Sequence, residues 1–163
     1  MSIFEEQISR KPDHYPWTEE FITAMHNGFW TDKEFNFQSD LQDFKVTLTD
    51  TERDMVTRSL SAIGQIEVAV KTFWAKVGEN LPHPSITDLG YVMANIEVIH
   101  NNAYERLLGV LGMEEDFEQN LQLDIIQNRV KYLRKYLKKR YKDANKQYVY
   151  SLVLFTLYVE NVS

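Results

Sequence analysis

The chain has 163 residues, no cysteine, and a formal net charge of −6 from 18 Lys and Arg against 24 Asp and Glu. This length predicts a single domain. The lack of cysteine excludes disulfides, zinc–thiolate sites and iron–sulfur clusters on this chain, and the acidic balance argues against nucleic acid as a partner. The six glycines and four prolines are few, which favours long helices over a many-stranded fold.

The sequence does not predict membrane insertion. The first ten residues contain no apolar core of the kind that a signal peptide has. The longest uncharged stretch near the C-terminus, residues 147–159, has 13 residues, whereas a helix needs about 20 to cross a membrane. We therefore expect a cytoplasmic protein with no membrane partner.

The N-terminal third predicts a lead-in followed by a long helix. Residues 1–47 are mixed, with one short helix over 19–27 that Gly28 ends. Thr49 and Glu52 have the spacing of a capping box, so a long helix should follow and stop at Gly78. Its apolar residues recur every three or four positions, which predicts one buried stripe. They are Leu60, Ile63, Ile66, Val70, Phe73, Trp74 and Val77.

Further long helices are expected in the remaining chain. One begins at Ser85 or Thr87 and ends before Gly112, and another covers residues 117–141. A last helix begins at Asp143 or Asn145, and its apolar run 148–159 predicts burial on all sides. This pattern predicts an all-α bundle of long antiparallel helices over residues 48–163. Because the chain ends on an apolar run, we expect it to be the N-terminal part of a larger folding unit.

Three acids and one histidine occupy positions that face the predicted core. Glu67 lies on or beside the apolar stripe of its helix, Glu97 and His100 are three residues apart on one helix face, and Glu160 ends the uncharged run. Buried carboxylates are costly unless they are paired or bound to a metal. Without cysteine, such a site suits iron or manganese. Spacing alone leaves open that each acid simply reaches solvent from the edge of its helix.

Several segments, which together cover about residues 15–163, resemble the small, radical-generating subunit of class I ribonucleotide reductase. The most specific segment is Glu97-Val98-Ile99-His100 with Tyr104 four residues later. The other segments are Phe29-Trp30-Thr31 with Glu34 and Asp40, Leu48-Thr49 with Glu52, Gln65-Ile66-Glu67 with Lys71 and Phe73-Trp74, and Tyr158-Val159-Glu160-Asn161.

The resemblance implies a single ferritin-like domain over residues 1–163 that holds part of a dinuclear metal site. It implies that Glu67, Glu97, His100 and Glu160 are metal ligands. Tyr104 would be the radical-bearing tyrosine, with Leu108 and residues of the last helix as its apolar walls, and Trp30 would begin the electron route to the large subunit. Because Glu67 stands where many family members have Asp, the metal identity stays open between Fe/Fe, which we favour, and Mn/Fe.

The resemblance also implies partners. The second Glu-x-x-His helix and the tail that docks on the large subunit would lie beyond residue 163. We therefore expect the C-terminal half of the same small subunit, homodimeric pairing of that subunit, and a large catalytic subunit as partners. The implied activity is generation of a tyrosyl radical by O₂ activation, for reduction of ribonucleotides to deoxyribonucleotides.

Two alternatives remain at this point. The chain could belong to another ferritin-like di-metal carboxylate oxidase in which Tyr104 holds no stable radical, or it could be a metal-free helical interaction module. Other residues have simpler interpretations. His14, His26 and His83 are predicted at the surface, Trp17 and Trp74 in the core, and the basic run 129–146 on a solvated helix face.

Overall fold

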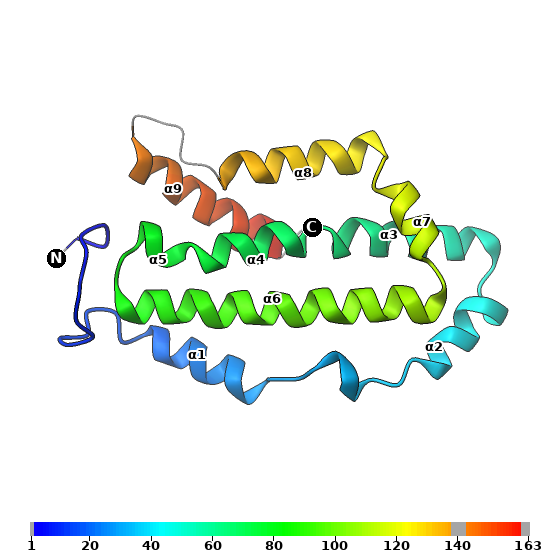
Figure 1. The fold of residues 1–163 in the computed structure, drawn as a ribbon, viewed down its shortest axis with the longest axis horizontal. Coiled ribbons are helices and arrows are strands. Elements are labelled where there is room, and N and C mark those ends of the chain that lie inside the picture. Colours follow the sequence, from blue (N-terminus) through cyan, green and yellow to red (C-terminus); the bar gives the residue numbers. More distant parts are fainter. Residues whose placement is uncertain (1, 138–142, 161–163) are drawn as a thin grey trace.

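The computed structural model describes residues 2–137 and 143–160, and every regular element within these ranges is helical (Figure 1). The α-helices are α1 (Thr18–Asn27), α2 (Gln38–Gln42), α3 (Asp50–Gly64), α4 (Glu67–Ala75), α5 (Val77–Asn80), α6 (Pro84–Leu111), α7 (Glu114–Asn120), α8 (Asp124–Tyr136) and α9 (Ala144–Val153). A short 3₁₀ helix, η1 (Asp32–Glu34), and two π-helical segments, η2 (Asp43–Thr47) and η3 (Leu154–Val159), complete the set.

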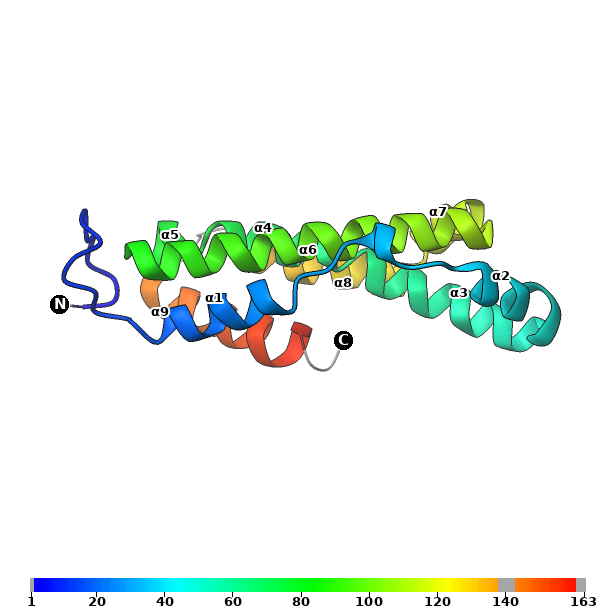
Figure 2. The same cartoon turned by 90° about the horizontal axis from the view of Figure 1, so that it is seen from below.

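The longest helix, α6, forms the axis of the molecule. Helices α3, α4 and α5 follow one another beside it, and α1 lies along its other side (Figures 1 and 2). Helix α6 begins with Pro84 at its first position and ends at Gly112, which adopts φ 71° and ψ 39°. This left-handed conformation is the C-terminal signal that the sequence predicted. The predicted N-caps Ser85 and Thr87 are wrong, because His83 occupies the cap position.

The helix predicted over residues 49–78 starts as expected but is interrupted. Thr49 and Glu52 form the predicted capping box, with the Thr49 amide donating to Glu52 Oε2 at 2.8 Å. The helix then breaks at Gln65 and Ile66, where the Ile66 amide bonds to the carbonyl of Ile63, three residues back. Such a tight turn redirects the chain. Glu67 consequently becomes the first residue of a new helix, α4.

The core connects α4 with the C-terminal helices. Phe73 stacks on Phe155 with ring centroids 4.2 Å apart and planes 5° from parallel. Tyr148 stacks on the same Phe73 ring at 5.9 Å. Buried aliphatic residues from α4, α5, α6 and α8 pack around these rings; they include Val70, Val77, Ile86, Ala94 and Leu133. This aromatic stack holds α9 and η3 against α4.

The third predicted long helix is two helices. It begins at Glu114 rather than at residue 117, stops at Asn120 and resumes at Asp124. The amides of Gln122 and Leu123 bond to carbonyls three residues back, which closes a turn between them. The C-terminal end of the predicted helix, residues 138–141, lies outside the described residues.

The last predicted helix is present but is not buried on all sides. Asp143 caps it by accepting a hydrogen bond from the Lys146 amide at 3.0 Å, as one of the two predicted caps. One face packs on the core through Tyr148, Ser151, Phe155 and Val159. The opposite face is exposed at Val149, Tyr150, Val153, Leu157 and Tyr158. This face stays exposed because α4 covers the last helix from one side only.

Of three predictions about the burial of single residues, one is confirmed and two are wrong. His83 is fully buried instead of lying at the surface, because its ring nitrogens lie 3.1 Å from Gln7 Oε1 and 3.2 Å from the Ser2 carbonyl oxygen. Trp17 was predicted in the core and is 49% exposed. Trp74 is buried as predicted.

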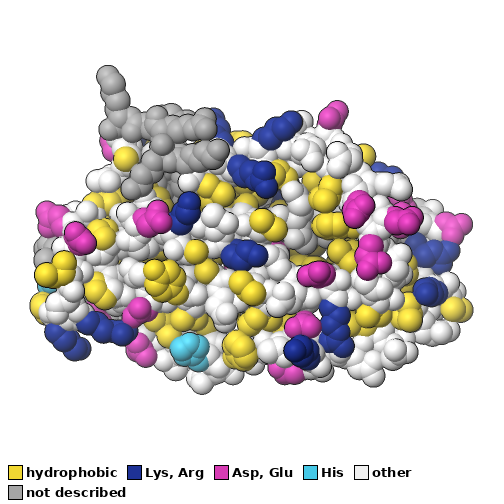
Figure 3. Space-filling model, viewed as in Figure 1, with side chains coloured by type: hydrophobic (Ala, Val, Ile, Leu, Met, Phe, Trp, Pro, Cys, Tyr) yellow, Lys and Arg dark blue, Asp and Glu magenta, His cyan; other side chains and the backbone are white. Residues whose placement is uncertain are grey.

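The molecular surface carries both charged and apolar groups. Figure 3 shows apolar side chains scattered between acidic and basic groups on the face viewed in Figure 1. Lys131, Arg134 and Lys135 of the basic run are exposed on α8, as predicted for a solvated face. Among the helices of the described residues, none is long and apolar enough to span a bilayer.

Candidate metal centre

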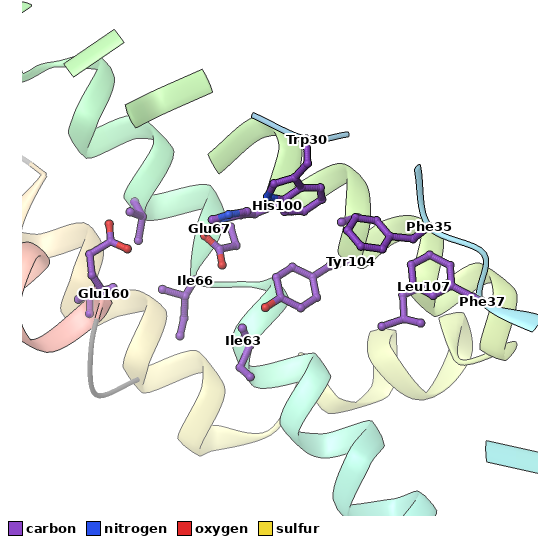
Figure 4. A pocket seen from close by; sticks show the side chains of 13 residues that line it. Trp30, Phe35, Phe37, Ile63, Ile66, Glu67, His100, Tyr104, Leu107 and Glu160 are labelled. Atoms are coloured by element: carbon purple, nitrogen blue, oxygen red, sulfur yellow. Dashed lines mark ion pairs between the residues drawn. The ribbon is translucent and has the colours of Figure 1, made fainter. Parts of the chain in front are cut away.

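Two helices bring three candidate ligands together. Glu67 is supplied by the start of α4, and Glu97 and His100 lie one turn apart on α6. One ligand atom from each of them lies within 4.8 Å of the other two. His100 Nδ1 is 3.0 Å from Glu97 Oε2 and 3.9 Å from Glu67 Oε2. Figure 4 shows Glu67 and His100 on the wall of one cavity.

The cluster is shielded enough to change the proton affinities of its members. Burial raises the pKa of Glu97 to about 7, and the nearby charge of Glu67 adds to this effect. Hydrogen bonding to Glu67 and Glu97 raises the pKa of His100 to about 10. Burial acts to raise the pKa of Glu67 too, but His100 and Glu97 outweigh it, so this pKa lies below its usual value. The imidazolium thus holds the two acids together.

Glu160 reaches the same cavity from the other side. It follows the π-helix η3, and its Oε1 accepts a hydrogen bond from Trp74 Nε1 at 2.8 Å. Glu160 is exposed to solvent and lines the cavity (Figure 4). Partial burial and the charge of Glu67 raise the pKa of Glu160. Glu160 is therefore near the cluster of Glu67, Glu97 and His100 but does not belong to it in this structure.

Tyr104 lies in the same cavity, one helical turn after His100. The cavity has a volume of about 580 Å³, and most of its wall is apolar. Its apolar lining includes Ile63, Ile66, Val70, Leu107 and Val159. Burial, followed by the charges of Glu67 and Glu97, raises the pKa of Tyr104. A half-buried phenol that stays protonated therefore stands beside the acid cluster.

One predicted neighbour of Tyr104 is wrong, because Leu107 and not Leu108 lines the cavity. We expected Leu108 as a wall, but Leu108 is buried in a separate cluster with Leu111 and Met113. Leu107 lines the cavity in its place, because the helix turns 100° per residue and the two side chains point to different faces. Val159 supplies the expected wall from the last helix.

Trp30 covers the outer side of His100. The two rings are stacked with centroids 5.8 Å apart and planes 27° from parallel. Phe35 contacts the opposite part of Trp30 edge-on at 5.2 Å. The chain preceding α2 therefore supplies one wall of the cavity through Trp30, Phe35 and Phe37 (Figure 4).

Sequence reasoning missed the role of Trp74, which it placed only in the core. Trp74 lies seven residues after Glu67, which is two helical turns, so both can point to the same side of α4. That spacing was a usable signal. The partner of Trp74, however, is 86 residues away in the sequence, and no local pattern indicates it.

The donor set suits a metal ion. Carboxylate oxygens and an imidazole nitrogen, without thiols, form a hard site that fits a first-row dication such as iron or manganese. Glu97 is buried, with 4% of its surface exposed, and Glu67 is partly buried. A cation would stabilise these two acids beside one histidine.

The described residues thus define an all-helical bundle of the ferritin-like class with a carboxylate and histidine cluster between its helices. The family model for the ribonucleotide reductase small chain matches residues 7–163. The chain therefore belongs to the ribonucleotide reductase small-chain family.

Individual relatives agree with this assignment. The chain is 25% identical over 123 residues to the ribonucleoside-diphosphate reductase subunit beta of Halalkalibacterium halodurans, covering 73% of this chain and 35% of that protein. It is 27% identical over 145 residues to a protein of Invertebrate iridescent virus 6 named Probable ribonucleoside-diphosphate reductase small subunit 376L, covering 86% of this chain and 40% of the viral protein.

A solved structure described as a class I ribonucleotide reductase of Bacillus halodurans has a similar fold. The TM-score is 0.73 at 22% sequence identity, and the match covers 84% of this chain and 50% of that chain. The chain thus spans half or less of the length of these matched proteins.

Proposed function

We propose that this chain is the N-terminal part of a ribonucleoside-diphosphate reductase small subunit that houses part of a dinuclear metal site. The observation that carries the proposal is the cluster of Glu67, Glu97 and His100. Two of its members, Glu67 and His100, line one largely apolar cavity together with Tyr104. Family membership over residues 7–163 supports the reaction class. The whole subunit would serve the reduction of ribonucleotides to deoxyribonucleotides in the cytoplasm.

Glu67, Glu97 and His100 would hold the metal from α4 and α6, and Glu160 would complete the contribution of this chain after a small movement from Trp74. The hard donors suit both iron and manganese, and we propose Fe/Fe as the centre, with Mn/Fe as the second possibility. When bound, such a centre supplies the oxidising power of O₂ reduction. Loading requires that Glu97 and His100 give up the protons that they hold in the metal-free chain.

Tyr104 is the proposed site of the radical. Its phenol would lose one electron and one proton, and the apolar walls from Ile63, Ile66 and Leu107 would keep water and reductants away from it. Trp30 is the proposed start of the electron route to the large subunit. Its stacking on His100 gives direct contact between the surface segment and the cluster.

The proposal requires partners. The second half of the ligand set would come from the C-terminal half of the same small subunit, within one ferritin-like domain of which residues 1–163 are the first part. That subunit would pair as a homodimer and act with a large catalytic subunit. The short coverage of the relatives, 35% and 40% of their lengths, supports a missing half.

The test uses the chain co-purified with a C-terminal half from the same genome and loaded with iron, or with manganese and iron. We expect two metals per assembly and a tyrosyl signal in electron paramagnetic resonance. Tyr104→Phe should abolish the signal and nucleotide reduction while metal content stays unchanged. Tyr91→Phe, at an exposed position of the same helix, is the matched control and should change neither.

Other outcomes would assign a different function. Metal without a tyrosyl signal would favour a different ferritin-like carboxylate oxidase. Absence of both metal and radical would favour a metal-free helical interaction module. A Tyr104→Phe protein that keeps the signal and full activity would remove Tyr104 from the proposed role.

A further inference from the structure

A second cavity lies away from the acid cluster, where the ends of α4 and α5 meet α8 and α9. Its volume is about 360 Å³, which is within the usual range of small-molecule sites. Phe73, Leu137 and Ala144 supply apolar wall, and Asn80, Gln147 and Tyr148 supply polar groups. None of these residues lines the cavity that holds Glu67 and Tyr104.

The polar groups of this cavity share an unusual property. Among the described residues, three buried side-chain atoms have no hydrogen-bond partner, and they are Asn80 Oδ1, Gln147 Nε2 and Tyr148 Oη. All three residues line this one cavity. Buried polar atoms nearly always have partners. Three exceptions in one place therefore indicate that a partner is missing there.

Neighbouring contacts determine what each orphaned atom can do. Asn80 Nδ2 donates a hydrogen bond to the Lys76 carbonyl oxygen at 3.0 Å. The atom of the Asn80 amide that remains without a partner is therefore its oxygen, which is an acceptor. Gln147 offers its amide as a donor. Tyr148 is 8% exposed, and burial raises its pKa, so its hydroxyl stays protonated and can donate. The cavity thus presents one acceptor and two donors.

The rim carries one charge of each sign. Lys76 and Glu79 both line the cavity and are both exposed. Their charges balance, so the cavity favours neither an anion nor a cation. Both side chains are long and exposed, so they can shift to admit a small molecule to the shielded atoms.

We propose that this cavity binds a small uncharged molecule that carries a hydrogen-bond donor next to an acceptor, as an amide or cyclic amide does. The N–H of the ligand would donate to Asn80 Oδ1. Its carbonyl oxygen would accept from Gln147 Nε2 and the Tyr148 hydroxyl, and its apolar part would lie against Phe73 and Leu137. Each orphaned atom would then have a partner.

The test uses the full chain and 2-pyrrolidone as the probe, with binding followed by chemical-shift changes in NMR titration. Cyclopentanone has the same ring size and carbonyl but no N–H group, and should bind more weakly. Tyr148→Phe and Gln147→Glu should each weaken 2-pyrrolidone binding, roughly three- to tenfold for the loss of one hydrogen bond. Tyr150→Phe, an exposed neighbour outside this cavity, is the matched control and should not change it.

Thermal melting without the probe provides an independent measurement. Since the Tyr148 hydroxyl has no partner, Tyr148→Phe should leave the melting temperature unchanged or raise it. A lower melting temperature would mean that water already satisfies the hydroxyl, which would overturn the proposal. Absence of saturable 2-pyrrolidone binding, or binding that neither Tyr148→Phe nor Gln147→Glu weakens, would overturn it as well.

Discussion

A single proton on His100 governs the electrostatics of the acid cluster. The imidazole lies 3.0 Å from a Glu97 oxygen and 3.9 Å from a Glu67 oxygen, so its positive charge offsets both acids. In the metal-free chain this imidazolium occupies the electrostatic role that a bound cation would take. The cluster therefore exchanges protons for metal, and its stability and its metal affinity should depend on pH in opposite directions.

The metal-free chain should lose stability as the pH rises from about 5 to 9. The pKa of His100 is about 10 when folded against an ordinary 6.5, so its stabilising charge is fully present below 6.5 and is lost as the pH approaches 10. Glu97 has a pKa of about 7 against an ordinary 4.5, so the folded state also loses stability between these values. Urea unfolding at several pH values measures this.

Two variants sharpen the pH experiment. Glu97→Gln removes the titration of Glu97, so the decline in stability should become shallower. Glu79→Gln, at an exposed acid distant from the cluster, should leave the decline unchanged. Metal affinity should increase over the same pH range. A metal-free chain that becomes more stable from pH 5 to 9 would contradict the assignment of these charges.

At the scale of the elements, α6 packs tightly against α4 and α5 at Gly90. A Cβ added at Gly90 of α6 would lie 2.7 Å from the Trp74 carbonyl oxygen and 3.0 Å from Val77 Cβ. Helix α6 can approach α4 and α5 this closely because Gly90 has no side chain. The same approach places Trp74 where its indole reaches Glu160.

Gly90→Ala should therefore destabilise the fold by about 1–3 kcal/mol, because the added methyl group meets backbone that cannot easily move. It should also loosen the position of Trp74, which indole fluorescence would report. Gly109→Ala is the control on the same helix, since the nearest atom to its Cβ is a flexible Glu114 oxygen at 3.4 Å. That variant should be neutral or up to about 1 kcal/mol more stable. Equal effects of the two variants would show that close packing at Gly90 is unimportant.

For the molecule as a whole, the main feature is the apolar outer face of α9 and η3. Val149, Tyr150, Val153, Leu157 and Tyr158 are all exposed there, and contiguous exposed apolar surface is typical of an interaction site. The proposed C-terminal half would cover this face and extend the bundle. Its helices would then also approach Glu160, which lies at the end of the same segment.

Leu157→Gln should weaken association with the C-terminal half by about 1–2 kcal/mol, roughly tenfold in affinity, because a large side chain loses its apolar burial. The stability of the isolated chain should change little, since Leu157 is 59% exposed. Ile125→Gln is the matched control, because Ile125 is even more exposed but lies on α8. Analytical ultracentrifugation of mixtures measures both. Equal affinity of the Leu157→Gln protein and the unmodified chain would show that the C-terminal half docks elsewhere.

Local patterns in the sequence determined the helical class and several exact features. The Thr49 capping box, the end of α6 at Gly112, the cap at Asp143 and the shared face of Glu97 and His100 are all confirmed. Each depends on residues at most four positions apart, and the geometry of a single helix turn relates such residues directly. The roles of Tyr104 and Trp30 remain predictions.

Features that depend on contacts between different helices follow from the tertiary structure and not from local sequence patterns. The break at Gln65 and Ile66 starts α4 at Glu67, and the packing of α4 on α6 then brings Glu67 to His100. The Trp74 bond to Glu160 and the burial of His83 by Gln7 join residues 86 and 76 positions apart. Helical periodicity shows which side of a helix is apolar. It does not show which helix covers that side, because that depends on packing between segments distant in the sequence.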